Sequence, residues 1–156
     1  MGSIAITNGT LVDGVGTRRA DLLIQNGVIA EVGEKLDGDT IIDADGLVIT
    51  PGFVDLQVHF REPGGEEAET IQTGSRGAAL GGFTAVVVMP NTTPTIDSAA
   101  VVRQIHDLSI DALCEVVPSA AITVDRDGEA LAPMAELVRS GVRPVSYTHL
   151  RAHETS

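Results

Sequence analysis

Short apolar runs separated by turn-forming residues make up residues 1–50. The runs at residues 4–7, 11–12 and 22–24 are each followed within one or two residues by an Asn-Gly or Asp-Gly pair. Such a pair between two apolar runs indicates a β-hairpin, because both residues tolerate the backbone angles of a tight turn. We therefore predict a small antiparallel β unit over residues 1–50.

From residue 51 onward, apolar strands alternate with segments of helical length. Strands are predicted over residues 53–60, 83–89 and 112–117, with a fourth beginning at residue 142, and helices over residues 67–80, 97–108 and 128–140. Apolar strands that alternate with helices are typical of βαβ units built around a parallel sheet. The sequence thus predicts an α/β protein with a boundary near residue 50.

Composition and charge limit the classes of partner. The chain has 156 residues, is 43% hydrophobic, has one cysteine and carries a net charge of −12. Phosphate backbones and anionic lipids repel such a chain, so neither a nucleic acid nor a membrane is expected as a partner. The N-terminus lacks a basic stretch followed by a long apolar segment, and no apolar run approaches bilayer length. We expect a soluble cytoplasmic protein.

Polar side chains cluster on one face of the predicted strand at residues 53–60. Because alternate residues of a strand share a face, four polar residues lie together: Asp55, Gln57, His59 and Arg61. Leu56, Val58 and Phe60 point the other way and are expected to pack beneath helices. Polar groups near the carboxyl end of such a strand occupy the usual place of an active site, and their burial is costly without a ligand. The spacing leaves two interpretations open: a ligand or metal site, or a hydrogen-bonded edge without a ligand.

A second candidate motif, MPNTTP, follows the next strand and contains Asn91. Taken alone, it indicates an ordinary turn between a strand and a helix, because Pro and Asn both favour turns. Its position at the carboxyl end of the adjacent predicted strand favours a functional interpretation, since parallel strands bring their carboxyl ends together.

These motifs resemble one known enzyme family. The segment PGFVDLQVHFREPGGEEAETIQTGSRGAALGGFTAVVVMPNTTPTID is similar to class I dihydroorotases, in the cyclic amidohydrolase group of the amidohydrolase superfamily. Three features carry the resemblance: a D-x-x-x-H-x-R-E-P-G strand end, the E-T-x-x-T-G-x-R-x-A-A-x-G-G-F-T segment, and M-P-N-T. Hydantoinases and allantoinases share the layout, but R-E-P-G together with M-P-N-T favours dihydroorotase.

The resemblance implies a fold and an activity. Residues 1–50 would form part of a composite β-sandwich, and residues 51–145 about three βα units of a truncated (β/α)8 TIM-type barrel. A complete barrel needs about 250 residues, so the chain resembles an N-terminal fragment that is inactive by itself. The implied reaction is the zinc-dependent, reversible cyclisation of N-carbamoyl-L-aspartate to L-dihydroorotate in pyrimidine biosynthesis. Homo-oligomers or association with aspartate transcarbamoylase would be possible for the full-length protein.

The resemblance also implies roles for individual residues. His59 matches a zinc ligand, and Arg61 and Asn91 match contacts to the substrate carboxylate; one or two zinc ions are implied for each full-length subunit. Gln57 stands where the family has its other strand-one histidine, and an amide oxygen is a weak zinc ligand. Gln57 could lower zinc affinity, shift the choice of metal or mark a non-catalytic homologue, or the remaining ligands could suffice. The catalytic residue is expected beyond residue 145.

Two alternative functions stay open. The chain could be another cyclic amidohydrolase of the hydantoinase or allantoinase type, or a non-catalytic dihydroorotase-like subunit that scaffolds aspartate transcarbamoylase.

Residues 146–156, SYTHLRAHETS, do not continue the apolar strand pattern. We interpret them as a non-native read-through tail, so that His149 and His153 have no selected role despite their spacing.

Overall fold

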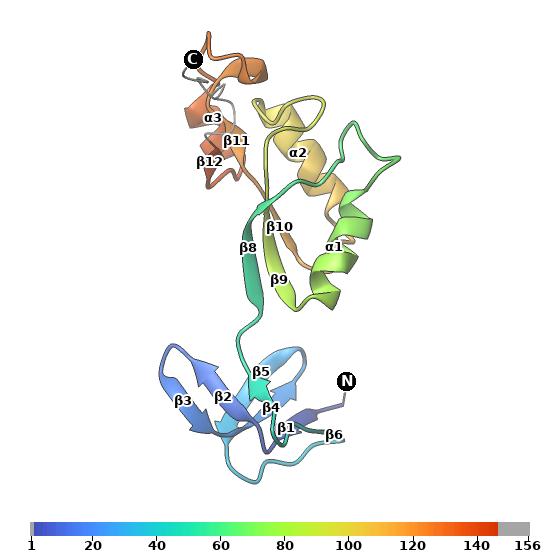
Figure 1. The fold of residues 1–156 in the computed structure, drawn as a ribbon, viewed down its shortest axis with the longest axis vertical. Coiled ribbons are helices and arrows are strands. Elements are labelled where there is room, and N and C mark those ends of the chain that lie inside the picture. The colour runs from blue at the N-terminus through green and yellow to red at the C-terminus, as the bar shows by residue number, and fades with distance from the viewer. Residues whose placement is uncertain (1, 147–156) are drawn as a thin grey trace, which may run out of the picture. The chain divides into compact units, whose positions relative to one another are not determined.

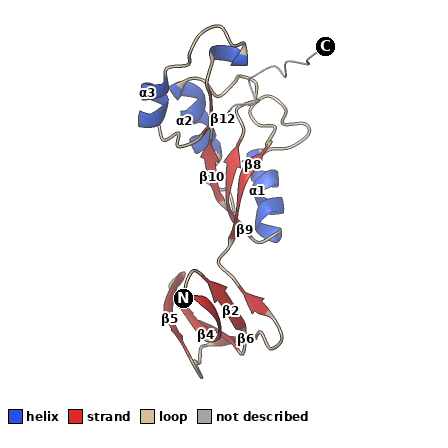
Figure 2. Cartoon of the chain, turned by 60° about the vertical axis from the view of Figure 1, so that its left-hand side comes forward, coloured by secondary structure: helices blue, strands red, loops and turns tan. Residues whose placement is uncertain are grey.

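A computed structural model gives the structure of the protein, and it describes residues 2–146. The chain divides into two compact units, Met1–Pro51 and Gly52–Ser156. Each unit is described by itself, and both are drawn in Figures 1 and 2. Among the described residues, no helix is long and apolar enough to cross a membrane.

The N-terminal unit consists of two small sheets. Its strands are β1 (Ile4–Thr7), β2 (Thr10–Asp13), β3 (Gly16–Arg19), β4 (Asp21–Gln25), β5 (Val28–Gly33), β6 (Thr40–Asp43) and β7 (Val48–Ile49). One sheet has the order β5-β4-β1-β6 and the other β3-β2-β7. The predicted turn at Asn26-Gly27 joins β4 to β5, and both residues have positive φ.

The prediction of a purely antiparallel unit is wrong for two strand pairs. The pairs β1–β4, β2–β3 and β4–β5 are antiparallel, but β6 pairs with β1, and β7 with β2, in parallel. The chain visits the two sheets in the same order and direction twice, first through β1 and β2 and then through β6 and β7. Such pairing depends on contacts between residues far apart in the sequence, which the local hairpin signals do not contain.

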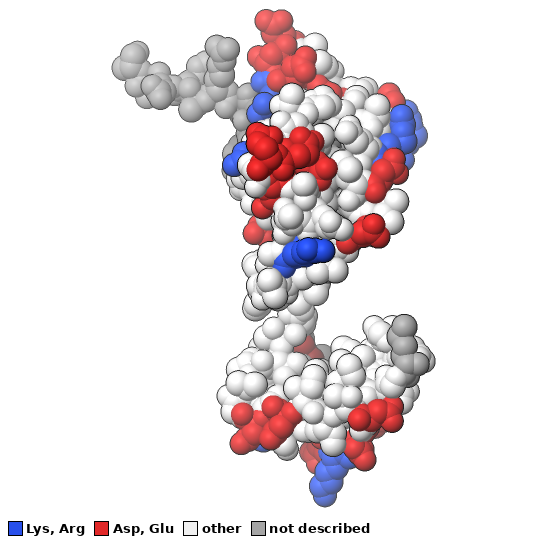
Figure 3. All heavy atoms as spheres, turned by 90° about the vertical axis from the view of Figure 1, so that its right-hand side faces the viewer, with Lys and Arg blue, Asp and Glu red and all other residues white. Residues whose placement is uncertain are grey.

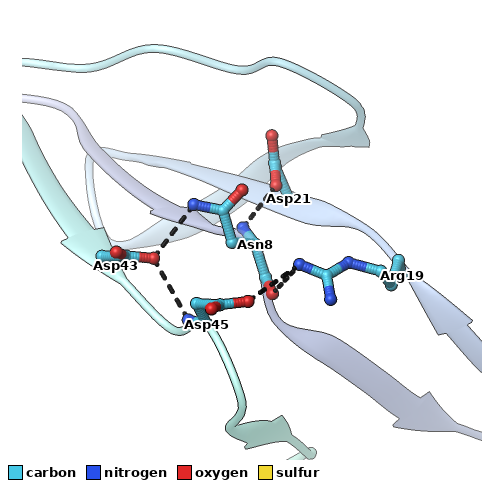
Figure 4. A network of polar contacts seen from close by, with 5 residues as sticks. All are labelled: Asn8, Arg19, Asp21, Asp43 and Asp45. Carbon is cyan, nitrogen blue, oxygen red and sulfur yellow. Dashed lines mark hydrogen bonds and ion pairs between the residues drawn. The ribbon is translucent and has the colours of Figure 1, made fainter.

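A polar network around Asn8 joins three segments of this unit (Figure 4). The Asn8 backbone N–H donates to Asp21 Oδ1 at 2.9 Å, and its side-chain amide donates to Asp43 Oδ1 at 2.9 Å. Arg19 donates to the Asn8 carbonyl at 2.8 Å and to Asp45 at 3.2 Å. Backbone hydrogen bonds to Asp21, above all from Asn8, lower the pKa of this carboxyl group. The network fixes the turn after β1 to the start of β4 and the end of β6.

The second unit alternates strands with helices. Its elements are β8 (Phe53–Val58), α1 (Ile71–Leu80), β9 (Phe83–Val88), α2 (Ala99–Leu108), β10 (Glu115–Pro118), β11 (Ala120–Ala121), the 3-10 helix η1 (Val124–Arg126), α3 (Met134–Arg139) and β12 (Val145–Ser146). The strands β8, β9 and β10 form a parallel sheet in the order β10-β9-β8. One residue beyond β10, β11 pairs in parallel with β12. The predicted mixed α/β class is confirmed.

Several predicted boundaries need correction. The helix predicted from residue 67 begins only at Ile71, because residues 66–69 form turns in which Ala68 donates to the Gly65 carbonyl. The helix predicted over 128–140 is shorter in the structure, where α3 covers only Met134–Arg139 and has Pro133 as its N-cap. The strand predicted over 112–117 begins later, as β10, because residues 109–111 form a turn after α2 in which the Ala112 N–H donates to the Ser109 carbonyl.

The core of the second unit lies between the parallel sheet and its helices. Val86 and Val88 of β9 are buried together with side chains from all three helices: Ile71, Val101, Val102, Ile105 and Leu137. Phe60 joins this core, as the alternation predicts. Leu56, in contrast, is 73% exposed and does not pack beneath a helix. The reason is that β8 forms the edge of its sheet, while α1 packs on β9.

Acidic side chains dominate the surface chemistry. On the face drawn in Figure 3, Asp and Glu form clusters on both units, whereas Lys and Arg are scattered. This distribution agrees with the net charge of −12.

Gly74 of α1 provides a test of the core packing. A methyl group at Gly74 would lie 2.7 Å from Cδ1 of Phe60, whereas one at Gly77 would meet no atom within 4 Å. Alanine is otherwise the better helix former by about 1 kcal/mol. We predict that Gly74→Ala lowers the free energy of unfolding by about 1–3 kcal/mol, because overpacking outweighs helix propensity. Gly77→Ala should raise it by about 0.5–1 kcal/mol. Urea titrations followed by circular dichroism measure both; a stabilising Gly74→Ala would contradict the packing described.

The Asp13–Arg18 pair of the β2–β3 hairpin predicts an acid-sensitive contribution to stability. Two parallel hydrogen bonds of 2.9 Å join the side chains, and the hydrogen bonds that Asp13 accepts, above all from Arg18 and then from the backbone N–H of Val15, lower its pKa from 3.8 to about 2. Because the folded pKa lies below the unfolded value, this stabilisation is present above pH 3.8 and is lost as the pH falls toward about 2. We expect Asp13→Asn to flatten the pH dependence of the unfolding free energy in that window. Glu34→Gln, which removes an exposed acid of the same unit, serves as the control; equal effects of the two variants would refute the assignment.

Candidate functional site

The candidate site lies at the carboxyl ends of β8 and β9. At the last residue of β8, the Val58 carbonyl accepts a hydrogen bond of 2.9 Å from the backbone N–H of Met89, the residue that follows β9. The residues that follow the two strands are therefore neighbours. His59 Nδ1 lies 2.9 Å from Asn91 Oδ1, in hydrogen-bonding contact. The two polar motifs of the sequence thus meet, as their positions after adjacent parallel strands predict.

The contact with Asn91 sets the role of each ring nitrogen of His59. An amide oxygen only accepts hydrogen bonds, so Nδ1 of His59 carries the hydrogen in this contact. In the neutral ring, Nε2 then keeps its lone pair. Metal-bound histidines commonly have this arrangement, with the other ring N–H donated to a carbonyl or carboxylate group. His59 is exposed and Asn91 half-buried, so the ring remains accessible while its partner is held.

The described residues do not form a complete zinc site around His59. Among residues 2–146, no group of three or more His, Cys, Asp or Glu side chains could hold a metal ion. Gln57 is exposed on β8, and its backbone N–H donates to Asp55 Oδ1 at 2.9 Å. An amide oxygen at Gln57 is a poor substitute for an imidazole toward zinc. His59 fits as a single ligand, and this part of the chain leaves the rest of the coordination sphere unfilled.

Arg61 follows the same strand and presents an exposed side chain. Within residues 2–146, no carboxylate forms an ion pair with it, since both ion pairs in this part of the chain involve other arginines. A guanidinium group donates two parallel hydrogen bonds to a carboxylate, which gives both affinity and orientation. Arg61 is therefore chemically suited to bind a small carboxylate ligand.

The loop after Arg61 is fixed at both ends. Glu62 Oε2 accepts a hydrogen bond of 2.7 Å from the backbone N–H of Ile71, the first residue of α1. On the other side, the backbone N–H of Thr93 donates to the Pro63 carbonyl at 3.0 Å. Gly64 has φ +99° and contacts the Thr93 backbone so closely that a Cβ atom would collide with the Thr93 carbonyl oxygen. Only glycine fits this crossing of the two loops.

The loop that carries Asn91 is also held by its own hydrogen bonds. The buried Thr92 donates its hydroxyl to the Pro94 carbonyl at 2.7 Å, and Ile96 donates its N–H to the Pro90 carbonyl at 3.3 Å. Met89 and Pro90 are buried beneath it. Asn91 therefore lies in an ordered turn, and the hydrogen bonds that hold the turn leave its side chain free to contact His59.

The sequence carries no signal for two features near the strand ends. Glu62 belongs to the R-E-P-G motif, and nothing local shows that it reaches the start of a helix nine residues later. In the turn after β11, Asp125 and Arg126 both have positive φ, and Arg126 Nε is buried without a partner among the described residues. Asp adopts positive φ more readily than most residues, whereas Arg rarely does, so only Asp125 carries a sequence signal for this backbone conformation. His149 and His153 lie outside the described residues.

Comparison with known proteins identifies one family. The family model described as Dihydro-orotase-like matches residues 46–149. A dihydroorotase from Caldanaerobacter subterraneus subsp. tengcongensis is 44% identical over 147 residues, which represent 92% of this chain and 34% of that protein. The chain therefore spans about a third of the length of the curated relatives that it matches.

Solved structures of a hydantoinase and a dihydroorotase have a fold similar to that of this chain. The structure of an L-hydantoinase from Arthrobacter aurescens matches with a TM-score of 0.66 at 22% identity, over 79% of this chain and 28% of that one. A dihydroorotase crystal structure matches with a TM-score of 0.61 at 20% identity, over 90% of this chain and 39% of that one. These likenesses establish the fold, and the family assignment rests on the sequence match over more than half of the chain. The chain belongs to the dihydro-orotase-like family.

Proposed function

We propose that the full-length protein containing this chain is a dihydroorotase. It would catalyse the reversible cyclisation of N-carbamoyl-L-aspartate to L-dihydroorotate in pyrimidine biosynthesis: the ureido nitrogen forms an amide bond to the side-chain carboxyl carbon, and water leaves. The observation that carries the proposal is the 2.9 Å contact between His59 and Asn91, which joins the two motifs characteristic of the family. The family match supports it.

We assign substrate binding to Arg61 and Asn91. The guanidinium of Arg61, which forms no ion pair within residues 2–146, would hold the carboxylate that does not react. Asn91 uses its Oδ1 atom toward His59, so its Nδ2 group remains to donate a hydrogen bond to the same carboxylate. Asn91 would thus bind substrate and orient His59 at the same time. The catalytic residue would come from the part of the protein beyond residue 145.

Zinc is the proposed cofactor, with one or two ions in each full-length subunit. His59 would supply one ligand through Nε2, and Gln57 occupies the other expected position on the strand. The missing ligands would come from the remainder of the protein, as the incomplete donor set within residues 2–146 requires. When bound, zinc would supply a polarised carbonyl group and an activated water. Residues of this chain would orient the substrate beside it.

The exposed apolar surface supports the proposal of a partial barrel and sandwich. Leu56 at the edge of the parallel sheet is 73% exposed, and Ile41 and Val48 of the N-terminal unit are 59% and 63% exposed. Exposed apolar strand faces of this kind require a cover. We propose that residues 51–145 begin a (β/α)8 barrel and that later segments complete both units. Cytoplasmic location and association with a second copy or with aspartate transcarbamoylase are further proposals.

Two other functions have one supporting observation each. A hydantoinase-type activity is favoured by the likeness to an L-hydantoinase structure, although at 22% identity that likeness concerns the fold alone. A non-catalytic scaffolding subunit is favoured by Gln57 at an expected ligand position. Arg61 argues against a hydantoinase-type activity, because a hydantoin ring has no carboxylate that could pair with its guanidinium group.

A chimera tests the proposed substrate. Residues 1–145 would be joined to the remaining two-thirds of the Caldanaerobacter dihydroorotase and assayed on carbamoyl-aspartate, hydantoin and allantoin. We expect turnover of carbamoyl-aspartate by the chimera and none by the 156-residue chain alone. Arg61→Lys should raise KM for carbamoyl-aspartate about tenfold or more, because the bidentate contact is lost. Arg76→Lys, at an exposed position of α1, is the matched control. Preference for hydantoin, or equal effects of the two substitutions, would refute the assignment.

The same chimera tests the position of Gln57. We predict that Gln57→His raises zinc affinity by about tenfold or more, because an imidazole nitrogen replaces an amide oxygen. His59→Ala should lower zinc content relative to the parent. Elemental analysis after purification and competition with a chelator measure both. If Gln57→His leaves zinc affinity unchanged, position 57 does not contribute a ligand.

A further inference from the structure

We propose that Glu62 is a positioning residue that holds Arg61 in place for carboxylate binding. This inference rests on the proposed function, in which Arg61 contacts the substrate. Glu62 does not itself face the ligand, because its carboxylate is occupied by the backbone N–H of Ile71 at 2.7 Å. It acts by fixing the residue beside Arg61 to the start of α1.

Among residues 2–146, Glu62 is the side chain that accepts a hydrogen bond from the first N–H of α1. The first N–H groups of a helix have no partner within the helix. Thr70 caps the N–H of Thr73 at 3.1 Å, and Thr73 in return accepts from the N–H of Thr70. This reciprocal capping does not reach the N–H groups of Ile71 and Gln72, and the side chain of Ile71 is fully buried. Glu62 supplies the missing acceptor from nine residues upstream.

The charge of Glu62 suits this position. The first turn of α1 contains no acidic residue of its own. A carboxylate at a helix N-terminus is stabilised by the helix dipole, and a hydrogen bond to a charged acceptor is stronger than one between neutral groups. Glu62 is therefore the carboxylate of this helix start, although it belongs to the loop after β8.

Arg61 lies between two anchors on the same helix. On one side, Phe60 is buried and packs against Gly74 of α1. On the other side, Glu62 bonds to Ile71, and Pro63 is held by the N–H of Thr93. The backbone of Arg61 has little freedom between these contacts, while its side chain stays exposed. Such pre-organisation reduces the conformational entropy that a ligand must overcome on binding.

Two matched variants separate this role from a general effect on folding. Glu62→Gln removes the charge but keeps an oxygen that accepts from Ile71. Glu62→Ala removes the acceptor. Glu67→Ala removes an exposed acid of the same loop that forms no side-chain hydrogen bond among the described residues, and it controls for the loss of negative charge near α1.

The test uses the chimera that contains residues 1–145. We expect Glu62→Ala to raise KM for carbamoyl-aspartate about tenfold with little change in kcat, because ground-state and transition-state binding are lost alike. Glu67→Ala should stay within about twofold of the parent, and Glu62→Gln should lie between it and Glu62→Ala, because it keeps the acceptor but loses the charge. In an Arg61→Lys background, the effect of Glu62→Ala should shrink, since coupled residues are not additive. Hydrogen–deuterium exchange should show the fastest uptake over residues 59–71 in Glu62→Ala.

Several outcomes would overturn the inference. Equal effects of Glu62→Ala and Glu62→Gln, a loss confined to kcat, or full additivity with Arg61→Lys would each exclude positioning of Arg61 by this hydrogen bond. If the parent chimera does not turn over carbamoyl-aspartate, the proposed function fails separately. The exchange measurement then decides whether Glu62 anchors the loop, and unchanged uptake in Glu62→Ala would reject it.

Discussion

Parallel pairing of β8 with β9 is the constraint on which the candidate site depends. It places the ends of the two strands side by side, and the bond from Met89 to the Val58 carbonyl continues the pairing to the last residue before His59. The His59–Asn91 contact is possible only because of this register. A shift of the register would move both motifs apart, although each would keep its local conformation.

Many residues that make the segment recognisable serve the loops rather than the chemistry. Thr70 and Thr73 cap α1, Gly74 makes room for Phe60, and Gly64 allows the two loops to cross. Glu62 joins the first loop to the helix. The site is thus a small set of exposed side chains, chiefly Arg61 and His59, on a backbone that its neighbours hold in place. This division explains how a motif of ordinary turn-forming residues can indicate one family.

The described residues lack a complete set of metal ligands around His59. His59 is a single imidazole, Gln57 offers an amide, and the described residues contain no further cluster of metal ligands. Among the described residues, apolar side chains of the edge strand and of the N-terminal sheets are exposed. Both observations fit a chain that spans about a third of its relatives. They agree with the proposal that the remainder of the protein supplies the other metal ligands.

The sequence by itself determined the alternation of strands and helices, the change of character near residue 50, and the meeting of the two polar motifs. These follow from hydrophobic periodicity and from the rule that parallel strands place their carboxyl ends together. It did not determine the late start of α1, the parallel pairs of the N-terminal unit, the exposure of Leu56 or the reach of Glu62 to Ile71. Each of these depends on which segment lies next to which in space. Tertiary contacts decide them, because a hydrogen bond or a buried face needs a partner that local sequence does not specify.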